Sequence, residues 1–153
     1  MPDRNPQQQF DAVEDLLTRW LKERRQVLGK YTEIVVGMDG LLDQDALDER
    51  QKLLCQLLVD YVSAGHFEVY HELLQEAEIF ADGSSSLAEK LMPAIGDTTE
   101  VILAYEEKYT SADRDGAKLK RDLSALGEVL ESRFLLEDKL IAGLHNSHRR
   151  QQG

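Results

Sequence analysis

Few residues in this chain have the types and spacing needed for chemistry, and the most regular of them are Glu68 and His71. Their Glu-x-x-His spacing places both side chains on one face of a helix. Di-iron carboxylate bundles use two such pairs on facing helices. This sequence contains no second pair. We therefore predict no metal site and no cofactor, and a metal-sensing bundle remains the alternative.

Nucleophilic catalysis also lacks its usual groups. The single cysteine, Cys55, lies in an apolar stretch with no histidine or basic residue near it in sequence to activate a thiolate. The chain has neither a Gly-x-Ser-x-Gly elbow nor a glycine-rich phosphate loop. We predict that the protein is not an enzyme and that Cys55 is a small buried hydrophobic residue.

Three charged residues fall among apolar ones at helical spacing and are more informative. Arg24 lies in the apolar stripe of a first helix, Glu137 lies in that of a last helix, and Arg133 precedes Glu137 by one turn. A lone buried charge is costly, whereas opposite charges satisfy each other. We predict a buried network of these three residues between the two helices. The alternative is a polar cavity that binds a small ligand or holds a carboxylate of raised pKa.

Helices must position these side chains. Apolar residues recur at helical spacing in segments of about 10–36, 43–65, 67–80, 87–109 and 117–145. Asp43 or Asp45 can cap the second helix, and Gly65 suits a left-handed end of that helix. Pro93 and Gly96 should kink or split the fourth helix. In the first helix the predicted buried face consists of Phe10, Val13, Leu17, Trp20, Leu21, Leu28, Tyr31 and Val35.

This pattern predicts an all-α fold, an antiparallel four-helix bundle with a short additional helix after Gly65. Loops are expected at Gly37–Asp43, Asp82–Ser86 and Thr110–Gly116. We expect a single domain over residues 10–146. The polar ends, residues 1–9 and 147–153, are expected to be disordered tails.

The stretch from Leu53 to Phe67 is apolar on nearly every side. On a helix, Leu54, Leu58, Tyr61 and Val62 share one face, whereas Asp60 and Ser63 lie opposite, flanked by Leu53, Leu57 and Val59. An exposed acid among apolar neighbours is typical of a protein-binding surface. The alternative is that a further helix covers these flanks and leaves Asp60 merely solvated.

Net charge narrows the choice of partner. The formal charge of the 153-residue chain is −11, and its acidic residues are spread along the sequence. Such a field repels nucleic acid and favours a basic partner. The sequence has no signal-peptide core and no apolar run long enough to cross a membrane. We therefore expect a soluble, cytoplasmic protein that binds neither nucleic acid directly nor a membrane.

Three blocks of residues resemble the signature of the Rsd/AlgQ family of regulators of sigma D. They are Leu58–Tyr61 with Ser63–Phe67 and Tyr70; Gly127–Glu131 with Arg133–Phe134 and Leu136–Ile141; and Arg19–Leu21 with Arg24. The blocks span most of the chain in the order and spacing of the family.

The resemblance implies a bacterial, helical anti-sigma factor. Its partner would be the C-terminal domain of the housekeeping sigma-70 class factor, which carries the helix-turn-helix for the −35 promoter element. On this basis Asp60 is the leading candidate for the acidic contact, with Ser63, His66 and Phe67 beside it. Leu53 and Leu57, placed by helical spacing, form the apolar flank. Trp20 matches the family but is predicted to pack in the core. A helical adaptor of another small cytoplasmic protein, or a metal- or ligand-sensing bundle, is the rival hypothesis.

Overall fold

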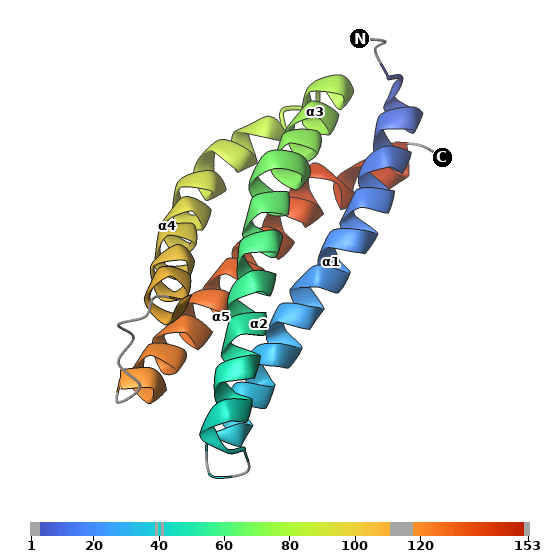
Figure 1. Ribbon diagram of the computed structural model, residues 1–153. Coiled ribbons are helices and arrows are strands. Elements are labelled where there is room, and N and C mark those ends of the chain that lie inside the picture. Colours follow the sequence, from blue (N-terminus) through green and yellow to red (C-terminus); the bar gives the residue numbers. More distant parts are fainter. Residues whose placement is uncertain (1–3, 39, 41, 111–117, 152–153) are drawn as a thin grey trace.

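The computed structural model describes residues 4–38, 40, 42–110 and 118–151, and every regular element in these ranges is a helix. Figure 1 shows the chain running down one long helix, up the next, down the third and up the last. The all-α prediction is confirmed for the described residues. The elements are α1 (Pro6–Gly37), α2 (Gln44–Ala64), the π-helical turn η1 (Gly65–Val69), α3 (Tyr70–Phe80), α4 (Ser85–Thr110), α5 (Leu119–Leu144) and the 3₁₀ helix η3 (Asn146–Gln151).

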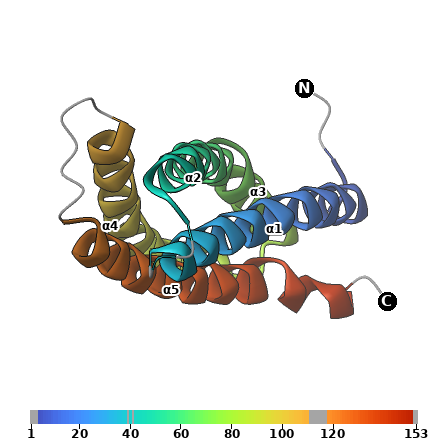
Figure 2. The ribbon, with the colours of Figure 1, turned by 60° about the horizontal axis from the view of Figure 1, so that its bottom comes forward.

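The helices enclose one apolar interior. α5 packs most extensively on α4, and α1 packs on α2 and α3, whereas α1 and α5 meet at few points. Figure 2 shows α1, α2, α4 and α5 arranged around a common centre. All of the long helices contribute fully buried side chains to this interior, among them Val27, Ile34, Leu54, Leu58, Leu73, Ile102 and Leu144.

α1 begins at Pro6 rather than near Phe10, because Asn5 forms a capping box. The Asn5 side chain accepts a 2.8 Å hydrogen bond from the Gln8 amide, and the Gln8 side chain accepts a 3.0 Å bond from the Asn5 amide. Gln9 is buried and donates to the Glu72 carbonyl at 3.0 Å. Residues 6–9, predicted as tail, are therefore helical.

The buried face of α1 differs from the predicted one beyond Arg24. Val27 and Ile34 are fully buried, whereas Leu28 and Val35 are exposed. The prediction for Leu28 and Val35 is wrong, because the buried face of α1 continues through Val27 and Ile34 instead. The flank of α1 that carries Leu28 is consequently left uncovered.

α2 does not stop at Gly65. The φ of Gly65 is −58°, so the predicted left-handed conformation is wrong. The chain instead passes through one π turn into α3. In this turn the Tyr70 amide donates to the Gly65 carbonyl. Gly65 allows a close approach, because a Cβ here would lie 3.2 Å from both Trp20 Cζ2 and Tyr70 Oη. At the other end of α2, the predicted cap is confirmed, since the Asp43 side chain accepts from the Ala46 amide at 2.8 Å.

α4 is a single helix with Pro93 inside it, so Pro93 does not split the helix. Its ribbon changes direction within its first half (Figure 1). The turn before α4 uses left-handed backbone at Ala81 and Gly83, with φ values of 51° and 83°. The predicted break at 110–116 falls almost wholly outside the described residues. Within those residues, no helix combines the length and the apolar character needed to cross a membrane.

Candidate protein-binding surface and the polar core beneath it

The outer side of α2 and η1 carries the residues predicted to bind a partner. Asp60, His66 and Phe67 are exposed, and Ser63 is half-buried. Leu53 is 41% exposed and Phe67 is 74% exposed, so no other helix of the described chain covers this flank. We call these residues, together with the half-buried Leu57, the Asp60 surface.

Two further acidic residues, which the sequence analysis did not select, extend the Asp60 surface. Glu23 of α1 lies near both Asp60 and Glu68 of η1. Partial burial raises the pKa of Glu23, and the charges of Asp60 and Glu68 raise it further, while Arg19 opposes them. Three carboxylates thus repel one another beside exposed apolar side chains. A basic partner would relieve this repulsion.

Phe67 borders a groove that separates α1 from η1 and α3. Its ring meets the His66 ring edge to face at 4.8 Å, and the ring is otherwise turned toward solvent. The groove encloses about 480 Å³ and is lined by Arg4, Ala12, Asp15, Leu16, Arg19, Phe67, Glu68, His71 and Glu72. The π turn is what places Phe67 here, because its extra residue changes the direction of the side chains that follow Gly65.

Trp20 lies in the core, as predicted, with 2% of its surface exposed. Its Nε1 donates to the Tyr61 carbonyl at 3.1 Å, and its ring stacks on Tyr61 with the centroids 5.3 Å apart. Tyr61 follows Asp60 directly in the chain and points to the opposite side. The Asp60 surface therefore has a tightly packed aromatic layer behind it.

The buried charges predicted from the sequence meet in this layer. Arg133 and Glu137 are completely buried, and Arg133 Nε donates to Glu137 Oε2 at 3.0 Å. Tyr61 donates to Glu137 Oε1, and Tyr70 donates to Glu137 Oε2 at 2.9 Å. Arg24 approaches Glu137 at 3.4 Å from α1. The predicted network of three residues is confirmed, and two tyrosines complete it.

The remaining donors of Arg133 are satisfied by α4 and α3. Its Nη1 donates to Thr98 Oγ1 at 3.0 Å and to Thr99 Oγ1 at 2.7 Å, and its Nη2 donates to Tyr70 Oη at 2.9 Å. The sequence analysis missed the threonines, because nothing in the pattern of α4 marks a polar patch on its core face.

The electrostatics of the network favour a structural role. Burial raises the pKa of Glu137, while Arg133 and the hydroxyls of Tyr61 and Tyr70 oppose this rise. Burial and the charge of Glu137 raise the pKa of both tyrosines, so they remain donors. Every group named here already has a partner, which favours internal pairing over the alternative of a ligand cavity.

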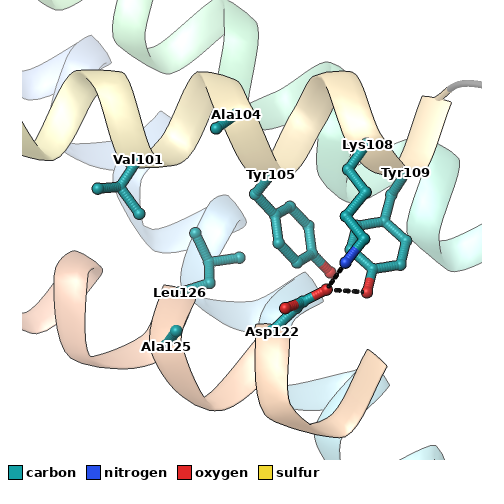
Figure 3. Close-up of a pocket in the computed structure, with 8 residues that line it drawn as sticks. All are labelled: Val101, Ala104, Tyr105, Lys108, Tyr109, Asp122, Ala125 and Leu126. Carbon is teal, nitrogen blue, oxygen red and sulfur yellow. Dashed lines mark hydrogen bonds and ion pairs between the residues drawn. The ribbon is translucent and has the colours of Figure 1, made fainter. Parts of the chain in front are cut away.

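A second polar contact joins α4 to α5 (Figure 3). Lys108 and Tyr109 both reach Asp122 Oδ2, each at 2.5 Å. Burial alone would raise the pKa of Asp122, but the hydrogen bonds from Lys108 and Tyr109 lower it. The adjoining pocket of about 200 Å³ is lined by Val101, Ala104, Tyr105, Lys108, Tyr109, Asp122, Ala125 and Leu126.

The Glu68 and His71 pair, considered above as metal ligands, lies exposed along the groove beside Phe67. Within the described ranges, no three His, Cys, Asp or Glu side chains are placed to hold a metal ion. Cys55 is buried, as expected from its neighbours.

Comparison with known proteins agrees with the three sequence blocks. Residues 3–145 match the model of the family described as regulator of RNA polymerase sigma(70) subunit, Rsd/AlgQ. The regulator of sigma D of Salmonella arizonae is 39% identical over 82% of this chain and 79% of its own length. The corresponding proteins of Pectobacterium atrosepticum and Yersinia enterocolitica are 35% and 31% identical, over 86% and 88% of this chain and 89% and 83% of their own lengths.

No solved structure matches the chain. The family match nevertheless covers nearly all of it, including α1, the Asp60 surface and the charged residues of α5. The chain therefore belongs to the Rsd/AlgQ family of regulators of the RNA polymerase sigma(70) subunit.

Proposed function

We propose that this protein is an anti-sigma factor that binds the C-terminal domain of the housekeeping sigma factor through the Asp60 surface. The single observation that supports this most is an exposed acid set among exposed apolar side chains, in a chain of the Rsd/AlgQ family. The bound sigma factor would be withheld from both core RNA polymerase and promoter DNA. The protein would act in the cytoplasm, without DNA contacts and without catalysis.

Charge and shape both suit this partner. A helix-turn-helix domain is basic where it faces the DNA phosphates, and the protein carries a formal charge of −11. Asp60, with Glu23 and Glu68 nearby, would meet that basic face. Leu53 and Phe67 supply apolar area that excludes water from the charged contacts.

Binding at the Asp60 surface would act by competition. A sigma domain whose basic helix is covered by carboxylates cannot offer the same residues to the −35 element. The mechanism would need no catalytic group and no cofactor. It would need only a complex with the sigma domain that is stable enough to compete with promoter DNA.

Titration of the isolated sigma C-terminal domain against three variants tests this proposal. Asp60→Ala should weaken binding by about thirtyfold or more, because truncating one member of a desolvated charge pair costs roughly 2–5 kcal/mol. Asp60→Asn retains the shape of the side chain but not its charge, so it should also bind poorly. Glu100→Ala, which removes an exposed acid from α4, is the control and should bind normally.

Thermal unfolding of the same variants separates a binding defect from a folding defect. Because Asp60 is exposed, all three should melt close to the wild type. Wild-type affinity of Asp60→Ala would show that the surface is wrongly assigned. An unfolded Asp60→Ala variant would place this residue in the core.

A further inference from the structure

A second cluster of buried charge lies at the C-terminal end of the molecule and was missed by the sequence analysis. His145, His148 and Glu76 are all completely buried. Glu76 Oε1 lies 2.7 Å from His145 Nδ1, and Glu76 Oε2 lies 2.5 Å from His148 Nδ1. The other ring nitrogens also meet carboxylates, His145 Nε2 with Glu14 at 2.8 Å and His148 Nε2 with Asp82 at 2.9 Å.

This arrangement favours the protonated form of both rings. A carboxylate oxygen can only accept a hydrogen bond, so a ring nitrogen that faces one must carry a proton. All four ring nitrogens of His145 and His148 face carboxylate oxygens. With the three carboxyl groups ionised, all four contacts are hydrogen bonds only when both rings are imidazolium cations. A neutral ring would turn a lone pair toward a carboxylate oxygen, although the ring itself is completely buried.

The surroundings match two positive rings. Phe10 stacks on His145 at 4.1 Å between ring centroids, and Phe80 stacks on His148 at 4.0 Å. Aromatic faces favour cations. Arg149 is the third cation, and it bonds to both oxygens of Glu14, at 2.8 and 2.9 Å.

The charges of the cluster balance only when both rings are protonated. Two imidazolium rings and Arg149 offset the carboxylates of Glu14 on α1, Glu76 on α3 and Asp82 in the following turn. The neighbouring carboxylate, Glu72, is paired with Arg4 at 2.9 Å. From α4, the apolar Leu87 faces this end of α5, and its Cδ2 would lie 2.1 Å from a Cβ on Gly143.

We propose that the end of α5 and the segment η3 form a proton-dependent clamp that closes onto α1 and α3 only while His145 and His148 are both charged. Docking of η3 takes up protons, because free histidines in a solvated tail are mostly neutral above pH about 6.5. Docking should therefore be complete at mildly acidic pH and should weaken as the pH rises. With two linked protons, the docking equilibrium falls by up to about a hundredfold per pH unit.

Long-range proton–nitrogen NMR spectra of the histidine rings test the charge state directly in the full chain. The spectra are recorded at about pH 7.5, and the exposed His66 and His71 serve as internal references in the same sample. His145 and His148 should give imidazolium spectra at the same pH. Neutral rings at these two positions in the folded protein would overturn the proposal.

Urea unfolding between about pH 6 and pH 9 tests the linkage. The wild-type protein should lose stability across this range more steeply than His148→Gln, which removes one of the two protons. His71→Gln, which changes an exposed histidine of α3, should follow the wild type. Equal slopes for all three proteins would refute the clamp. Should His148→Gln fail to fold, the NMR spectra of the wild type still decide the question.

Discussion

At the residue scale, Glu137 and Asp138 show how strongly position decides the worth of a charge. The two acids are adjacent in α5, and both pair with Arg24, at 3.4 and 2.8 Å. The Glu137 side chain is fully buried, whereas the Asp138 side chain is 57% exposed. Glu137 also holds Arg133, which has no access to water. Removing Glu137 leaves the buried Arg133 without its counter-charge. Removing Asp138 affects only Arg24, which water can solvate.

Glu137→Ala should therefore lower the free energy of unfolding by roughly 3–5 kcal/mol. Asp138→Ala, its matched neighbour, should cost less than about 1 kcal/mol, as exposed ion pairs usually do. Urea denaturation followed by circular dichroism measures both. A loss below about 1 kcal/mol for Glu137→Ala would mean that water reaches Arg133 when the carboxylate is gone.

At the scale of the element, the sequence predicted the helices well and their ends less well. Apolar spacing located the five α-helices of the described residues, and an acidic cap located the start of α2. Local patterns could not show which of the adjacent residues Val27 and Leu28 faces the core, because both are apolar. They also could not show that Gly65 packs against Trp20 within a continuous helix, because a helix-ending glycine and a packed glycine look alike in sequence.

The Asp60 surface and the C-terminal cluster differ in the same way. The outward direction of Asp60 could be predicted because it depends only on the spacing of residues within its own helix. His145 and His148 looked like part of a polar tail, because their carboxylate partners come from residues distant in the chain. Long-range pairing of this kind has no periodic signature.

Two helical glycines offer an opposed pair of substitutions at this scale. A Cβ on Gly127 would lie 2.2 Å from the Tyr31 hydroxyl, which donates to the Leu123 carbonyl at 2.8 Å, whereas a Cβ on Gly96 meets nothing within 4 Å. Gly127→Ala should thus destabilise by about 1–3 kcal/mol through overpacking. Gly96→Ala should stabilise by about 0.5–1 kcal/mol, because alanine favours the helix.

Chemical denaturation of the two variants gives both signs in one experiment. In a Tyr31→Leu background the penalty of Gly127→Ala should largely vanish, because the obstructing hydroxyl is gone. A penalty that persists there would place the clash elsewhere.

At the scale of the whole molecule, the formal charge of −11 determines how a basic partner arrives. Charge over the entire surface speeds encounter, whereas the contacts of the interface govern how long the complex lasts. Raising the salt concentration from about 0.05 to 0.5 M should slow association with the sigma domain by roughly tenfold or more. The dissociation rate should change much less.

Stopped-flow mixing measures the two rates separately. Glu100→Ala should keep nearly the full salt dependence of association, since it removes only one of many charges. An association rate that is indifferent to salt would mean that long-range attraction plays no part in the encounter.

The π turn at Gly65–Val69 has a consequence for how the gene can tolerate insertions and deletions. Such a turn is an α-helix that carries one extra residue, and each residue turns a helix by about 100°. Deleting one codon between Gly65 and Val69 would restore a regular helix and rotate all of α3 relative to α2. Tyr70 would then turn away from Glu137, and Glu76 from both histidines, so both buried clusters would lose a member at once. The loss of one amino acid, far from the C-terminus in sequence, would release the C-terminal segment from its contacts.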